Sequence, residues 1–261
     1  MNDQAGEIKT LWRQALSWPA SLLFPATCPG CRRHVSRPDT LCAHCWPRLK
    51  LLEQPWCAVT GTPFTHDLGD GIVSADAIAN PPDYDRARAA VAYTDIARRM
   101  VQSLKFRDRT ELAPWMAEWM VRVGSELVAD CQTIVPVPLH RRRFLLRGFN
   151  QAAELARTLA ERTGRDFAPQ ALHRIKPTRQ QVGLGLSQRE RNVRGAFQVP
   201  QEAGIAIAGR RVLLVDDVLT TGATVSACAR SLKKAGANGV DVLAFARVLP
   251  GDFQDRDATS I

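Results

Sequence analysis

From Ala87 onward, this chain alternates between continuous apolar runs and stretches whose apolar residues recur every three or four positions. Continuous runs are typical of strands that are buried on both faces of a parallel sheet. Helical spacing marks the helices that cover such a sheet. The pattern therefore predicts an α/β domain. Its expected strands are 87–93, 133–140 running into a turn, 212–215 and 240–248.

Four stretches between and after these strands have the spacing of amphipathic helices. Thr110 is the expected cap of the second helix, Pro114 lies in its first turn, and Gly164 is the expected stop of the third. The tryptophans of the second helix are interpreted as core residues rather than as a platform for a nucleobase. The residues that show this spacing are Ile96, Met100, Val101 and Leu104; Trp115, Trp119, Val123 and Leu127, on one face; Leu155 and Leu159, which are expected to point inward; and the stretch from Val225 to Leu232.

The stretch from Arg211 to Thr224 carries the strongest functional signal. Asp216 and Asp217 come where a buried strand is expected to end, and a small hydroxyl-rich loop follows before a helix; its residues are Thr220, Thr221, Gly222, Ala223 and Thr224. Loop amides, threonine hydroxyls and the helix dipole favour a phosphate there. Carboxylates repel phosphate, so the acid pair is expected to face sugar hydroxyls or a metal. The alternative is an ordinary turn after two capping aspartates.

Two further segments are strongly basic. The first is a turn with four arginines before the helix 152–162, namely Arg141, Arg142, Arg143 and Arg147; it indicates a second anion site or a solvated basic loop. The second runs from Arg174 to Phe197 without an apolar period and includes Arg179, Arg189 and Arg191. We interpret it as a lid over a phosphate-rich ligand, with a disordered basic connector as the alternative.

Two Cys-x-x-Cys pairs near the N-terminus predict a structural zinc site. Cys28, Cys31, Cys42 and Cys45 present four thiolates, which complete a tetrahedral Zn²⁺ site without an open position. A redox pair with unrelated cysteines is the alternative. Cys57 opens a similar turn that lacks its second cysteine, so we interpret it as a vestige or a packed thiol.

The predicted organisation has five parts. They are an N-terminal helix (1–24), a zinc-binding module (25–60), a linker or irregular cover (61–84), the α/β domain (85–250) and a tail (251–261). The net charge of +9 favours phosphates or nucleic acid as partners. No apolar run reaches transmembrane length, so membrane insertion is not expected. The apolar stretch 16–26 could be mistaken for a signal-peptide core, but Pro19 and Pro25 interrupt it, so export is not expected. The cysteines are then expected in the cytoplasm, a reducing compartment that favours metal over disulfides.

The order of these motifs resembles the ComF family of competence proteins and GntX-like relatives. Besides the cysteine pairs and the acid–loop stretch, it is carried by Leu104-Lys105-Phe106-Arg107, Val135 to His140, Arg147 to Gln151, Thr178 to Gln181 and Glu190-Arg191-Asn192. The resemblance implies a zinc-binding N-terminus on a type I phosphoribosyltransferase fold, a mostly parallel sheet with flanking helices. It also implies a link to DNA uptake or to the use of external DNA.

The same resemblance assigns roles to the acid–loop stretch. It implies that Asp216 and Asp217 hold the ribose hydroxyls of phosphoribosyl pyrophosphate (PRPP), and that residues 220–224 wrap its 5′-phosphate. Mg²⁺ would bridge ribose and pyrophosphate. Basic residues would neutralise the pyrophosphate or form the lid; these are Lys105, Arg107, Arg141, Arg142, Arg143, Arg147, Arg179, Arg189 and Arg191.

Three interpretations of the function remain open at this point, and a regulator that senses PRPP without chemistry ranks below the other two. The first is a phosphoribosyl transfer enzyme of unknown acceptor and without an assigned catalytic residue. Thr220 stands where purine-salvage enzymes carry an aspartate, which disfavours a purine acceptor. The second is a module without catalytic activity that grips single-stranded DNA along the arginine-rich loops and serves competence or recombination proteins.

Overall fold

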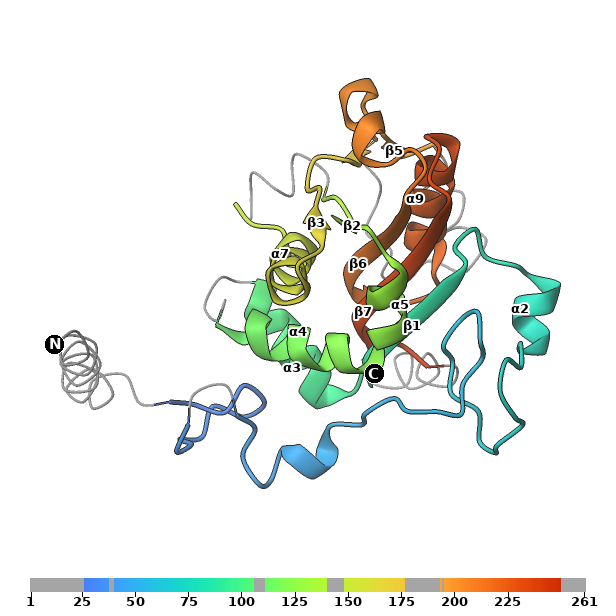
Figure 1. Cartoon of the computed structure of the whole chain (residues 1–261). Helices are drawn as coiled ribbons and strands as arrows, with labels where there is room; N and C mark the ends of the chain where they lie inside the picture. Colours follow the sequence, from blue (N-terminus) through green and yellow to red (C-terminus); the bar gives the residue numbers. More distant parts are fainter. Residues whose placement is uncertain are drawn as a thin grey trace, which may run out of the picture. The chain divides into compact units, whose positions relative to one another are not determined.

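The computed structural model describes residues 26–37, 40–105, 111–139, 148–176, 193 and 195–249 (Figure 1). The chain divides into two compact units, residues 1–48 and 49–261. The first unit contains the cysteine pairs, an antiparallel bridge between Thr27 and His34, and the short 3-10 helix η1 (Trp46–Arg48). The second unit contains the sheet.

A five-stranded, fully parallel sheet forms the centre of the second unit. Its strand order is β1-β7-β6-β2-β3. The strands are β1 (Arg86–Ala92), β2 (Thr133–Pro136), β3 (Asp166–Phe167), β6 (Arg211–Leu219) and β7 (Gly239–Arg247). Almost every residue of β1, β2 and β7 is buried, as expected for a sheet that is covered on both faces. The predicted fold class is confirmed.

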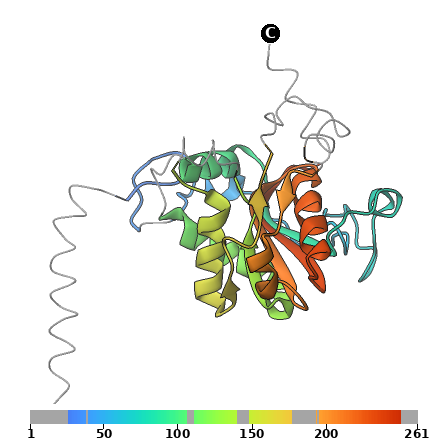
Figure 2. The ribbon, with the colours of Figure 1, turned by 90° about the horizontal axis from the view of Figure 1, so that it is seen from above.

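Helices cover both faces of this sheet, as Figure 2 shows. One face carries α4 (Leu112–Val123), α5 (Ser125–Asp130) and α7 (Gln151–Thr163), and the other carries α9 (Ala223–Lys234). Helix α3 (Asp95–Lys105) follows β1 and contacts α4. Cys228 and Leu232 of α9 are fully buried in the core cluster with Val212 and Val242 of the sheet. Burial of these apolar side chains is the main stabilising term for the unit.

The connections reverse direction between β2 and β6. The unit β2–α7–β3 runs toward one edge of the sheet, whereas β6–α9–β7 runs toward the other edge. In an open parallel sheet such a reversal leaves a crevice beyond the carboxyl ends of the two central strands, where ligands bind. The residues that follow β2 and the residues at the end of β6 therefore lie at the expected ligand position.

The expected stripe of tryptophans on the second helix is wrong in two respects. Helix α4 ends at Val123, and α5 is a separate helix after Gly124. A Cβ on Gly124 would lie 2.7 Å from Leu243 Cδ1, so the chain approaches the sheet too closely there for a larger residue. The buried face of α4 is formed by Leu112, Ala113, Met116, Ala117 and Met120. Trp115 and Trp119 lie half-buried beside it, with Trp115 against Phe245.

The segment from Lys50 to Gly61 covers the free edge of β1. Backbone hydrogen bonds join Leu52 N–H to Ala90 O (3.0 Å) and Ala92 N–H to Lys50 O (2.8 Å). Farther along, Ala87 N–H donates to Val59 O (2.7 Å). These contacts explain why the division between the two units falls at Arg48 and not near residue 60.

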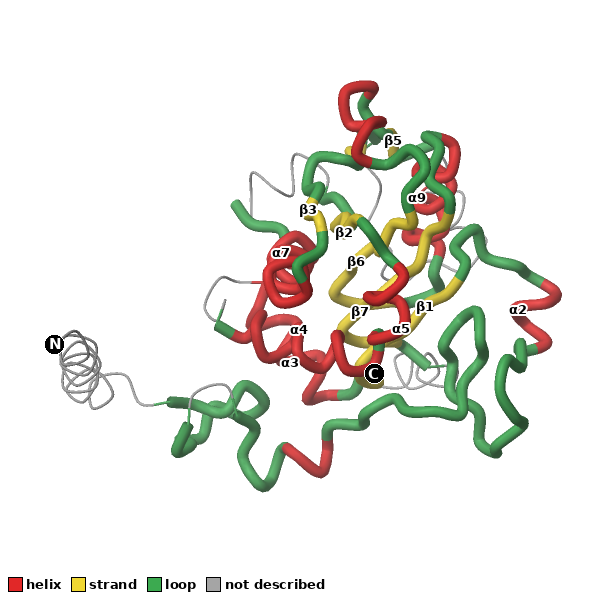
Figure 3. The backbone as a smooth tube through the Cα atoms, in the orientation of Figure 1, coloured by secondary structure: helices red, strands yellow, loops and turns green. Residues whose placement is uncertain are grey.

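The segment that follows, up to Asp85, consists mainly of loops and turns, with the short helix α2 (Ala75–Ala79) as its regular element (Figure 3). Two short strands, β4 (His173–Arg174) and β5 (Phe197–Gln198), form a separate antiparallel pair. The 3-10 helix η2 (Gln201–Ala206) precedes β6. In the part of the chain that the structure describes, no helix is both long and apolar enough to cross a bilayer.

Candidate functional site

Both aspartates of the predicted acid pair lie inside β6, near its carboxyl end. The strand does not end before them as expected, because its pairing with β7 continues through Asp216–Ala244 to Leu219–Arg247. Asp216 and Asp217 are half-buried, and Asp217 N–H donates to Asp216 Oδ1 (2.9 Å). The pair therefore stands on a central strand of the sheet at the point where the connections reverse.

The small-residue loop leads directly from β6 into α9. Gly222 is the N-cap residue of α9 and has a φ of +81°, a left-handed conformation that favours glycine. Ala223 N–H points to Thr221 Oγ1 at 3.5 Å, and the first intrahelical bond runs from Ser226 N–H to Gly222 O (2.8 Å). Because the first amides of a helix have no intrahelical acceptor, residues 220–224 form an arrangement suited to an anion.

A second helix begins beside the same edge of the sheet. The N-cap residue of α7 is Asn150, whose side-chain oxygen accepts from Ala152 N–H (3.2 Å). Its amide nitrogen donates to Val137 O (3.2 Å), which ties the helix start to the residue after β2. The predicted basic turn leads into this helix, but Arg141, Arg142, Arg143 and Arg147 lie outside the described residues, as does Arg107; Lys105 is the last residue of α3.

The predicted lid is closed at its base by the β4–β5 pair. Its ends meet where Arg174 pairs with Phe197, and Ile175 N–H donates to Ala196 O (2.8 Å). The Arg174 guanidinium also lies over the Phe197 ring, 5.4 Å from its centroid. Arg179, Arg189 and Arg191 lie outside the described residues, so their role in a lid stays a prediction.

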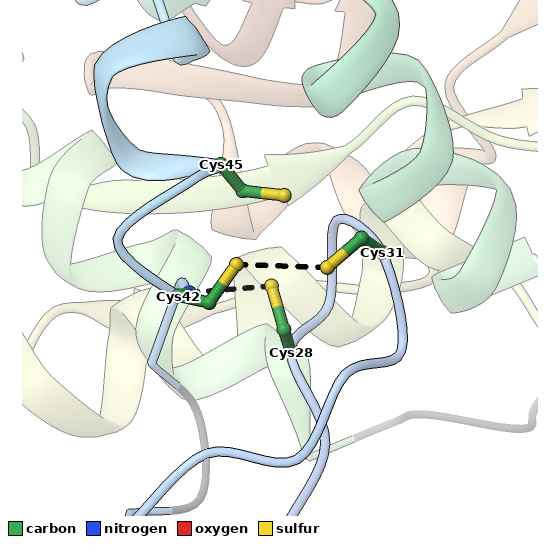
Figure 4. Close-up of side chains that lie close together, drawn as sticks. All are labelled: Cys28, Cys31, Cys42 and Cys45. Carbon is green, nitrogen blue, oxygen red and sulfur yellow. Dashed lines mark hydrogen bonds between the residues drawn. The ribbon is translucent and has the colours of Figure 1, made fainter.

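The four predicted zinc ligands converge in the first unit (Figure 4). Their Sγ atoms all lie within 4.8 Å of one another, and Cys31 Sγ is 3.5 Å from Cys42 Sγ. Sulfur atoms around tetrahedral zinc are about 3.8 Å apart, given Zn–S bonds of about 2.3 Å. The quartet therefore fits a structural Zn²⁺ ion with all four positions filled by protein.

Hydrogen bonds already favour the ionised form of one ligand. Backbone N–H groups, chiefly that of Cys45, lower the pKa of Cys42 to about 6 despite the opposing effect of desolvation. Burial has the opposite effect on Cys45, whose pKa is raised. The Cys28 thiol accepts a hydrogen bond from Cys42 N–H (3.3 Å). Zinc would supply the positive charge that holds all four groups as thiolates.

Two neighbours of the loop 220–224 carry no signal in the sequence. Tyr84 is 5% exposed, and its hydroxyl lies 3.5 Å from the position that a Cβ on Gly222 would occupy. Arg247, the last residue of β7, is paired in register with Leu219, immediately before the loop. The sequence pattern predicts a linker at Tyr84 and an apolar strand at Arg247, so it marks neither residue as part of a site.

Comparison with known proteins gives two family matches. Residues 20–77 match the double zinc ribbon domain, and residues 147–257 match the phosphoribosyl transferase domain. The chain is 30% identical to DNA utilization protein YhgH of Salmonella typhimurium, over 88% of this chain and 94% of that protein. It is 27% identical to competence protein F of Haemophilus influenzae, over 86% of this chain and 98% of that protein.

Among solved structures, orotate phosphoribosyltransferase from Aeropyrum pernix is similar with a TM-score of 0.33 and 18% identity, covering 66% of this chain and 87% of that one.

The match to a double zinc ribbon raises the question of how many zinc ions the chain binds, because a double ribbon has room for two metal sites. Between residues 46 and 77 the sequence contains a single cysteine, Cys57. Within the described residues, the Cys28–Cys45 quartet is the metal-ligand cluster. The donor set therefore fits one zinc ion.

Proposed function

Because this chain belongs to the family of the YhgH DNA utilization proteins and competence protein F, with a phosphoribosyltransferase-like domain, we propose that it binds Mg²⁺-PRPP. The observation that carries the proposal is the acid pair directly ahead of the hydroxyl-rich loop at the reversal point of the sheet. Asp216 and Asp217 would accept hydrogen bonds from the ribose hydroxyls. Residues 220–224 and the start of α9 would hold the 5′-phosphate.

The proposed reaction is transfer of the phosphoribosyl group. The bond between the anomeric carbon and pyrophosphate breaks, the electron pair leaves with pyrophosphate, and the acceptor atom bonds to that carbon. No described side chain at the loop is a strong general base, since Thr220 stands at its start. Catalysis would therefore rest on stabilising charge and excluding water. Mg²⁺ and the basic residues of 105–107, 141–147 and 179–191 would neutralise the leaving pyrophosphate.

Isothermal titration with Mg²⁺-PRPP tests the binding step. The double variant Asp216→Asn, Asp217→Asn should bind at least 100-fold more weakly, because amides accept hydrogen bonds from ribose hydroxyls less strongly than carboxylates do. Asp166→Asn is the matched control: this aspartate lies in β3, is mostly exposed and pairs with Arg210. Its affinity should stay within twofold of the parent. Equal PRPP affinity in the double variant and the parent would refute the assignment of both aspartates to ribose.

Single-stranded DNA is a second candidate ligand, in keeping with the names of the relatives. The specific observation is the net charge of +9, together with the concentration of arginine in residues 141–147 and 174–194. DNA offers no ribose diol to the acid pair, so its contacts would be with the basic segments. Fluorescence anisotropy with a labelled oligonucleotide, with and without Mg²⁺-PRPP, tests whether the two ligands compete. Displacement of DNA by PRPP would indicate that both ligands bind at the loop 220–224.

A further inference from the structure

The second unit contains an almost fully buried tyrosine whose hydroxyl forms no hydrogen bond with the described residues. Tyr84 is 5% exposed, and none of the described residues offers its hydroxyl a hydrogen bond. The ring is enclosed by the fold, whereas the hydroxyl oxygen itself is not fully buried. Burial also raises the pKa of Tyr84, so the group is a neutral donor at physiological pH. A donor that stays accessible and has no acceptor among the described residues is suited to an acceptor supplied by a ligand.

The hydroxyl lies against the loop that begins α9. Its oxygen is 3.5 Å from the Cβ position of Gly222, and its ring carbon Cε1 is 3.7 Å from that position. Any other residue at 222 would place a methyl group or a larger side chain against the hydroxyl. Glycine leaves this space open beside the start of α9.

The chain on both sides of Tyr84 is fixed to α9 and β7. Asp83 forms two hydrogen bonds with Arg230, at 3.1 and 2.6 Å, and its N–H donates to Ser226 Oγ (3.4 Å). Asp85 pairs with Lys233, and its backbone and side chain bond to Val240 on β7. Tyr84 is therefore held in one position before any ligand arrives, which lowers the entropic cost of using it in binding.

The positive charge of Arg247 lies near enough to the tyrosine to interact with its hydroxyl electrostatically. Arg247 Nη1 donates to Thr60 O (2.6 Å), and its Nε is buried without a partner. In the described part of the chain Arg247 has no carboxylate partner, and its pKa is lowered by burial. The Thr60 carbonyl belongs to the turn 57–61, which packs on β1. The nearby Tyr84 and Cys57 offset part of this lowering of the Arg247 pKa, and an anion at the loop would add a further countercharge for Arg247.

From this geometry we propose that Tyr84 and Arg247 complete the phosphate site at residues 220–224. The Tyr84 hydroxyl donates to an oxygen of a phosphomonoester, and the positive charge of Arg247 supports the bound anion electrostatically. The ligand class is a sugar phosphate, and the site would recognise its phosphate group alone. This inference extends the proposed function but does not require pyrophosphate, Mg²⁺ or a particular acceptor.

The chain offers a direct test because it contains two tyrosines, Tyr84 and Tyr93. Full-length protein labelled with 3-fluorotyrosine should give two ¹⁹F resonances, which Tyr84→Phe and Tyr93→Phe assign. Titration with ribose 5-phosphate and with inorganic phosphate should shift the Tyr84 resonance saturably and leave that of Tyr93 in place. A Tyr84 resonance that does not move while ribose 5-phosphate saturates the protein overturns the proposal.

Affinities give the second readout. Tyr84→Phe removes one oxygen atom and should weaken ribose 5-phosphate binding about tenfold, as for the loss of a hydrogen bond to a charged group. Tyr93→Phe should change it less than twofold. Arg247→Met should also weaken binding, whereas Arg247→Lys should keep most of it; Arg210→Met, at the opposite end of the sheet, is the charge control. Unchanged affinity in both Tyr84→Phe and Arg247→Met overturns the proposal.

Mg²⁺-PRPP added to the same samples separates this inference from the proposed function. Protein that binds ribose 5-phosphate through Tyr84 but does not bind Mg²⁺-PRPP would contradict the proposed function and support the phosphate site. Protein that binds Mg²⁺-PRPP equally well with and without the Tyr84 hydroxyl would support the proposed function and overturn this inference. Absence of saturable binding of any of the three ligands would overturn both.

Discussion

Replacing Gly61 by alanine tests how tightly the turn 57–61 packs on the edge strand β1. Gly61 has a φ of +66°, and a Cβ would lie 2.2 Å from the carbonyl oxygen of Ala87 and 3.1 Å from its carbonyl carbon. Both atoms belong to the backbone of β1 and cannot rotate away as the end of a side chain could. Alanine therefore forces either the turn or the strand to move.

Two costs add up in this variant. An L-residue in the left-handed region costs about 1–2 kcal/mol. Overpacking against a well-packed neighbour costs about 1–3 kcal/mol more. We expect the free energy of unfolding to fall by about 2–5 kcal/mol, which lowers the Tm by roughly 10 °C in a unit of this size.

Gly71→Ala provides the matched control. Gly71 has a nearly equal φ of +72°, but a Cβ there would meet nothing within 4 Å. This variant pays only the conformational cost, so its Tm should fall by no more than about 5 °C. Thermal unfolding followed by circular dichroism measures both variants, and urea unfolding gives the free energies. Equal losses in the two variants would show that the turn does not press on β1, which would refute the close packing.

Three further predictions concern metal, pH and DNA. Purified, unoxidised protein should contain one zinc ion per chain, and Cys42→Ser should lose it; metal analysis that finds two ions, or retention of zinc in Cys42→Ser, would contradict the Cys₄ site. Although burial opposes ionisation of Cys57, hydrogen bonds from Ser74 and Thr60 lower its pKa from 9.0 to about 7. Stability from this thiolate is complete above pH 9 and lost as the pH falls through 7, so zinc-saturated protein should gain about 1–2 kcal/mol between pH 7 and 9. The Cys57→Ser variant should lack that gain. An equal dependence of the unfolding free energy on pH in both proteins would exclude a contribution from the Cys57 thiolate. Replacing Arg142, Arg143, Arg189 and Arg191 by alanine should flatten the salt dependence of single-stranded DNA binding by about 0.7 per lost contact. An equal change in salt dependence after replacement of Lys233 and Lys234 would instead indicate that the net positive charge attracts DNA over the whole surface.

Parts of the site that are contiguous in the sequence could be predicted from it. Strand, acid pair, loop and helix follow one another between Arg211 and Lys234, and the structure has them in that order. The cysteine pairs likewise predict a metal site from the sequence alone, because a tight turn brings both thiols of a pair together. The strand end was misplaced, since acidic residues at the centre of a sheet can keep their backbone pairing with β7.

Contacts between distant segments could not be predicted. The bond from Asp83 to Ser226 joins residues 143 positions apart, and no local pattern signals it. Tyr84 lies in a stretch without hydrophobic periodicity, for which the sequence predicts only a linker. The tryptophan stripe failed for a similar reason: helical spacing identifies a face, but the position of Gly124 against Leu243 decides where the helix stops.

The cover on β1 has a practical consequence for dividing this protein into fragments. A fragment that starts at residue 85 would contain the whole parallel sheet, yet it would expose the backbone edge of β1 that now bonds to Lys50, Leu52 and Val59. Exposed edges of apolar strands are templates for pairing between molecules and lead to aggregation. A fragment that begins at Leu49 keeps its own edge partner. The segment between the cysteine pairs and the sheet thus acts as a built-in guard against self-association.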